Sequence, residues 1–91
     1  MGKEKKLFKS EEKRNRSDVS AFLRQLADKI GEGQVILRQG KDELPLNFPQ
    51  YLVLEIQVED EKKKRKGIQH SLEIEIKWFD SDSAGSLLEI A

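Results

Sequence analysis

The side chains with the clearest chemical potential are four glutamates in two alternating segments, Glu55, Glu59, Glu73 and Glu75. If the two segments pair as antiparallel strands about a turn near Arg65, Glu55 lies across from Glu75 on one face. Paired carboxylates support acid–base catalysis or bind a hard cation. On an open sheet, however, water screens both charges. We therefore expect a solvated acidic face, with no catalytic or metal-binding role.

A run of five cations, Lys62, Lys63, Lys64, Arg65 and Lys66, lies between the same two segments. Such a run matches the pattern of a basic targeting or nucleic-acid-binding patch. It contains no aromatic residue that could stack on a base, and neither neighbouring segment resembles an RNP motif. We interpret it as a solvated connector over residues 60–70. The alternative is weak binding of a polyanion, aided by residues 1–16, which carry a net charge of +4.

Other functional side chains are few. His70 is the single histidine and the chain has no cysteine, so the usual transition-metal site cannot be built. His70 and Ser71 are adjacent in a predicted strand, and adjacent side chains point to opposite faces. The sequence contains no phosphate-binding glycine loop or nucleophile elbow. We expect no catalytic activity and no cofactor.

Two segments with a strict period of two must position these side chains. In Ser71–Trp78, apolar residues alternate with Glu73, Glu75 and Lys77, and Leu52–Glu59 alternates in the same way. Each therefore predicts a strand with one apolar and one charged face. Trp78 ends its segment on the apolar side, where we expect it to anchor the rim of the core or to contact a partner.

One helix is predicted from apolar residues at helical spacing, Val19, Phe22, Leu23, Leu26, Ala27 and Ile30. Ser17 is the expected N-cap, and Gly31 or Gly33 the expected C-cap.

Three further strands are predicted at Lys6–Ser10, Gln34–Arg38 and Leu44–Phe48, the last weakened by Pro45. The order is therefore β-α-β-β-β-β. We expect an α+β fold in which one amphipathic helix packs on one face of a mostly antiparallel sheet of four to five strands. Residues 1–79 form this single domain, and the serine-containing segment 80–91 is expected to be a disordered tail.

Length and composition limit the partners. The 91 residues carry 17 basic and 17 acidic side chains, which removes any general case for nucleic-acid or acidic-membrane binding. No apolar run is long enough to span a membrane, and we expect a cytoplasmic protein. A domain of this size buries little apolar surface on folding. Burial of more apolar surface between two copies would add stability, which favours a homodimer.

The order of the segments resembles that of the amphi-Trp domain, a small prokaryotic family named for an amphipathic C-terminal strand that ends in tryptophan. The residues that carry the resemblance are Ser71–Trp78, preceded by Leu54–Glu59, with Ser17–Asp28 similar to the helix of the family and Gly33–Leu37 to its next strand. The family carries no established activity, so the resemblance implies a fold and no catalytic residues.

The sequence therefore predicts a small, non-catalytic interaction module with an unidentified protein partner or a second copy as its ligand. Its working surface is expected on the charged face or the free strand edge, with Trp78, Glu55, Glu73 and Glu75 as the candidate interface. The alternative is a polyanion binder that uses residues 62–66.

Overall fold

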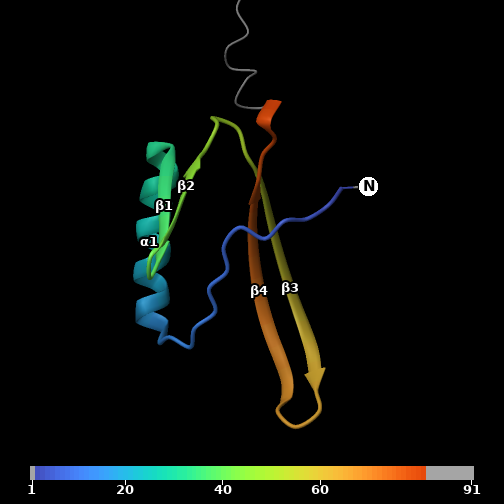
Figure 1. Ribbon diagram of the computed structural model, residues 1–91. Helices are drawn as coiled ribbons and strands as arrows, with labels where there is room; N and C mark the ends of the chain where they lie inside the picture. The colour runs from blue at the N-terminus through green and yellow to red at the C-terminus, as the bar shows by residue number, and fades with distance from the viewer. Residues whose placement is uncertain (1, 82–91) are drawn as a thin grey trace, which may run out of the picture. The chain divides into compact units, whose positions relative to one another are not determined.

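The computed structural model describes residues 2–81. It contains one helix, α1 (Arg16–Glu32), and four strands, β1 (Gln34–Gln39), β2 (Asp42–Asn47), β3 (Val53–Lys63) and β4 (Gly67–Lys77). The α+β class is confirmed. The chain divides after Phe48 into two compact units (Figure 1), one with α1, β1 and β2 and the other with β3 and β4.

The strands pair two by two. β1 pairs with β2 and β3 with β4, each pair antiparallel, in two separate two-stranded sheets. The sequence predicted a single sheet of four to five strands, and the described residues form two separate sheets instead. The strand predicted at Lys6–Ser10 is also wrong, because no ladder bonds form there. With four lysines among residues 2–9 and one apolar pair, Leu7-Phe8, this segment lacks the alternation that would give a strand one buried face.

α1 begins one turn earlier than its apolar pattern. Asn15, and not Ser17, is the N-cap: its side-chain Oδ1 accepts a hydrogen bond from the Asp18 backbone N–H at 2.7 Å. Asn15 has the extended backbone that an N-cap needs, and Asn caps at least as well as Ser. Asp18 then places a negative charge in the first turn, where it favours the positive end of the helix dipole.

Gly33 ends α1, as one of the two expected C-caps. Its φ of 93° lies in the left-handed region that favours glycine. Its N–H donates to the carbonyls of Lys29 and Ile30, and its own carbonyl accepts from Phe48 N–H at 2.9 Å. One residue thus ends the helix, directly precedes β1 and holds the chain that leaves β2.

The first unit has a small core on one face of its sheet. Val35 pairs with Leu46 and Leu37 with Leu44, so these four side chains share a face. Val35 is the one buried apolar residue among the residues described, 8% exposed, and the other three are half-buried. α1 lies against β1, yet Phe22 on its apolar stripe is 55% exposed.

β3 and β4 form a hairpin longer than the sequence predicted. The expected connector 60–70 shrinks to the turn at residues 64–66, and the ladder extends to the pair Lys63–Gly67. The sequence misses this extension because charged residues dominate 59–66 and hide the alternation. A turn around Arg65 is confirmed, and Gly67 follows it with a φ of 81°.

We expect Asn15→Ala to lower the free energy of unfolding by about 1 kcal/mol, because it leaves a helix N–H without its acceptor. Urea denaturation followed by circular dichroism measures the change. Ser17→Ala is the matched control and should change stability by no more than about 0.5 kcal/mol. A larger loss in the Ser17 variant than in the Asn15 variant would contradict the assignment of the cap.

Candidate functional site

The two faces of the β3–β4 hairpin have opposite chemistry. Directly paired residues share a face in an antiparallel ladder. One face carries three aliphatic pairs, Leu54–Ile76, Ile56–Ile74 and Val58–Leu72. The other carries Glu55–Glu75, Gln57–Glu73 and Glu59–Ser71. We call the first the apolar face and the second the acidic face.

The apolar face is open to solvent in the described structure. The exposed fraction runs from 52% for Ile74 to 71% for Val58, with Leu54, Ile56 and Leu72 between them, and Ile76 is half-buried. Single exposed aliphatic residues are normal on protein surfaces, but a contiguous ladder of six is typical of a binding surface.

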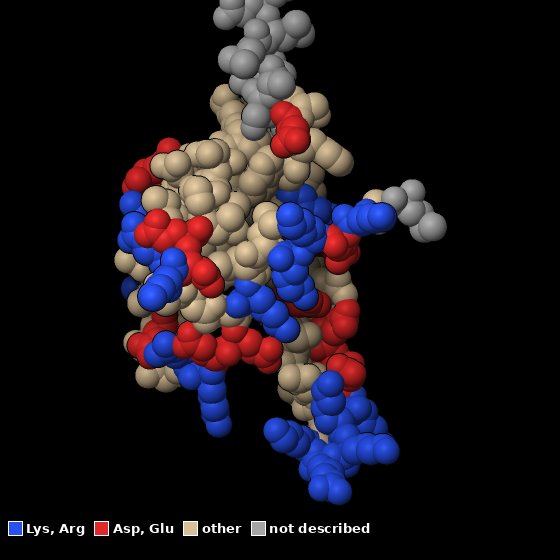
Figure 2. Space-filling model, viewed as in Figure 1, with Lys and Arg blue, Asp and Glu red and all other residues tan. Residues whose placement is uncertain are grey.

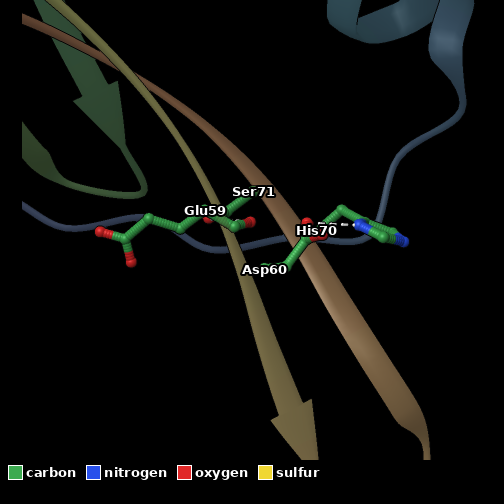
Figure 3. A network of polar contacts seen from close by, with 4 residues as sticks. All are labelled: Glu59, Asp60, His70 and Ser71. Atoms are coloured by element: carbon green, nitrogen blue, oxygen red, sulfur yellow. Dashed lines mark hydrogen bonds and ion pairs between the residues drawn. The ribbon is translucent and has the colours of Figure 1, made fainter.

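A polar pair limits the apolar face on the side of the turn. His70 and Asp60 are directly paired next to Val58–Leu72, with 2.6 Å between His70 Nδ1 and Asp60 Oδ1. Figure 3 shows this pair across the hairpin, with Glu59 and Ser71 beside it. Ser71 Oγ donates to the Glu59 carbonyl at 3.4 Å. His70 is therefore engaged with Asp60, while Ser71 bonds to the backbone of β3, so the two side chains contact different groups.

The acidic face brings Glu55 and Glu75 directly opposite each other, as expected from a turn near Arg65. Like charges in that position destabilise a ladder by up to about 1 kcal/mol. Lys77 offsets the repulsion: its Nζ lies 2.8 Å from Glu55 Oε1 and 3.8 Å from Glu75 Oε1. The hydrogen bond and charge of Lys77 lower the pKa of Glu55, and Glu55 in turn raises the pKa of Lys77.

This arrangement gives the acidic face no enclosed site. Glu55, Gln57, Glu73 and Glu75 line a shallow hollow of about 210 Å³, and Lys77 Nζ lies 2.8 Å from Glu55 Oε1. Within residues 2–81, no three carboxylate or imidazole side chains gather as a metal ion would require. Trp78 follows the last residue of β4 and is half-buried.

The five cations gather at the tip of the hairpin. Lys62 and Lys63 are the last residues of β3 and the other three form the turn. All five are exposed, and Figure 2 shows them as a single basic cluster. Lys63 Nζ lies 3.2 Å from Glu61 Oε1, an exposed pair that contributes little to stability.

A second hollow lies in the first unit and was not predicted. It is an open groove of about 610 Å³ between α1 and β1, with Phe22, Leu26 and Val35 among its lining residues. Phe8, from the segment before the helix, also lines it and is half-buried. The isolated pair Leu7-Phe8 in a charged segment was the signal that could have indicated this contact.

Comparison with protein families gives a match over the full length of the sequence. The family model of the amphi-Trp domain matches residues 1–91, the whole chain. No curated protein and no solved structure matches. Among residues 2–81, no helix combines the length and the hydropathy that crossing a bilayer requires. The expected tail, apart from Asp80 and Ser81, lies outside the described residues.

We expect Lys77→Met to raise the pKa of Glu55 toward its ordinary value, because both the hydrogen bond and the neighbouring positive charge are lost. A ¹³C NMR titration of the Glu55 carboxyl measures it, with Lys66→Met as the control lysine. An unchanged Glu55 titration in Lys77→Met would refute the pairing.

The same pair predicts a pH dependence of stability. A carboxyl group with a lowered folded-state pKa contributes stability above its unfolded pKa and loses it as the pH falls through the folded value. The wild type should therefore lose more of its unfolding free energy on acidification than Lys77→Met. Urea denaturation at a series of pH values tests this.

Proposed function

The chain belongs to the amphi-Trp domain family, and we propose that it is a non-catalytic binding module whose β3–β4 hairpin docks on another protein surface. The observation that supports this is the exposed apolar face of the hairpin, with its six aliphatic side chains in one ladder. An isolated two-stranded hairpin is marginally stable in water, so a face of this kind is stabilised when something covers it.

The proposed surface differs from the one that the sequence suggested. Glu55, Glu73 and Glu75 lie on the acidic face, where Lys77 and solvent already satisfy them. Covering them would remove charges from water at a cost, whereas covering the apolar face gains about 25 cal/mol per Å². We therefore assign the binding role to Leu54, Ile56, Val58 and their partners on β4. Trp78, at the open end of the ladder, stays a candidate for the rim of the interface.

A second candidate function, polyanion binding, is favoured by the position of the basic cluster. Five cations on a hairpin tip project together, and each phosphate contact would release counterions. The tip lacks an aromatic residue for base stacking, so such binding would be sequence-independent and weak.

A photoreactive amino acid tests the primary proposal. Placed at position 56 on the apolar face, it should give protein adducts of defined mass in cells, resolved by electrophoresis and mass spectrometry. The same group at position 57, on the acidic face, is the matched control and should give few. Equal labelling at the two positions, or none at either, would refute the apolar face as the binding surface.

Fluorescence titration with labelled single-stranded DNA at 50 and 200 mM salt tests the second candidate. We expect affinity to fall by at least about tenfold between the two salts, and Lys63→Gln/Lys64→Gln/Arg65→Gln to remove binding at 50 mM. The charge-matched control is Arg24→Gln/Lys29→Gln/Lys41→Gln, which should still bind. Absence of binding at 50 mM salt would reject polyanion recognition.

A further inference from the structure

We infer that the apolar face of the hairpin is covered by the same face of a second copy of this chain, with the two hairpins antiparallel. This inference rests on the proposed function and names its partner. Two features of the hairpin carry it: the size and shape of the apolar face, and the distribution of charge along its long axis.

The apolar face matches what a symmetric interface needs. A two-fold axis uses the same patch on both subunits, so the patch must be complementary to itself. Ile56–Ile74 is the middle pair of the ladder, flanked by Leu54–Ile76 on one side and Val58–Leu72 on the other. An axis through the middle pair packs each flanking pair against the other flanking pair of the second copy. Aliphatic side chains of similar size then meet across the whole face.

The area is adequate for a stable dimer. The six aliphatic side chains are mostly more than half exposed, and together they offer roughly 600 Å² of accessible apolar surface per copy. A standard interface buries ~800 Å² per partner, which is close to this area. Two sheets that pack face to face lie about 10 Å apart, with their side chains interdigitated. The dimer thus supplies the second layer that a two-stranded sheet lacks.

Charge selects the antiparallel orientation. Residues 60–70, at the tip, carry five cations and two carboxylates, a net charge of +3. The remaining strand residues, 53–59 and 71–77, carry four carboxylates and one lysine, a net charge of −3. The hairpin is therefore neutral as a whole but strongly polarised along its axis. A parallel pair would place tip beside tip, and like charges repel; an antiparallel pair about the middle of the ladder holds the two basic tips at opposite ends of the dimer.

Sedimentation velocity of the pure, full chain over a range of concentrations tests the association. We expect a dimer that dissociates on dilution. Ile56→Thr/Ile74→Thr keeps the β-branched side chains of the ladder and should weaken the dimer by at least about a hundredfold. Gln57→Thr/Glu73→Thr alters the neighbouring pair on the acidic face and should leave it unchanged. A monomer at every concentration, or a dimer that survives Ile56→Thr/Ile74→Thr, would overturn the inference.

A distance measurement tests the orientation without touching the interface. The chain has no cysteine, so Arg65→Cys gives one spin label per copy, at the tip. With about 3.3 Å of rise per residue, antiparallel hairpins place the two labels roughly 50–60 Å apart, and parallel hairpins bring them within about 20 Å. Pulsed electron paramagnetic resonance separates the two, and the short distance would overturn the antiparallel arrangement.

The outcomes also separate this inference from the broader proposal. A monomer whose position 56 still forms adducts with a different protein would reject the dimer and retain the binding module. A monomer without adducts at position 56 would reject both. Adducts of twice the mass of the chain, together with a concentration-dependent dimer, would support both.

Discussion

A two-stranded sheet must have its apolar face covered, and this constraint governs the C-terminal half of the molecule. Each strand of the β3–β4 hairpin is 11 residues long. Among the described strands, each forms ladder hydrogen bonds with a single neighbour, along one of its two edges. Cross-strand pairs of aliphatic residues stabilise the ladder by roughly 0.2–1 kcal/mol each, which is little against the entropy of ordering both strands. Burial of the six aliphatic side chains against another surface stabilises the hairpin more than these pairs do.

The acidic face has the opposite requirement. Glu55 and Glu75 repel across the ladder, and Lys77 bridges them at the open end of the hairpin. Such exposed pairs contribute little to stability but keep the face charged and hydrated. A charged face also discourages stacking of further sheets, so the proposed association through the apolar face would close after one partner instead of continuing into a filament.

The elements with clean periodicity could be predicted from the sequence. The apolar positions of α1 and the pairing of Glu55 with Glu75 follow from spacing, and the C-cap is Gly33, one of the two glycines that the sequence offered. The N-cap was misplaced because Asn15 and Ser17 are both good caps, and only the backbone decides between them. The strand at Lys6–Ser10 was wrong because that segment lacks the alternation that gives a strand one buried face. The site was harder to predict than the fold. Alternation located both faces of the hairpin but does not say which of them a partner covers, and the carboxylates were chosen as the candidate interface. Which surface stays uncovered depends on how segments far apart in sequence pack, and periodicity within one segment carries no information on that.

Gly33 has a consequence for how the family can vary in length. Its N–H closes the helix on Lys29 and Ile30, while its carbonyl receives Phe48 N–H from the far end of the β1–β2 ribbon. A residue inserted on either side of it would rotate the ribbon relative to the helix and break one of these bonds. Insertions and deletions should therefore be rare at this joint and common at the two turns, where a longer loop costs only closure entropy.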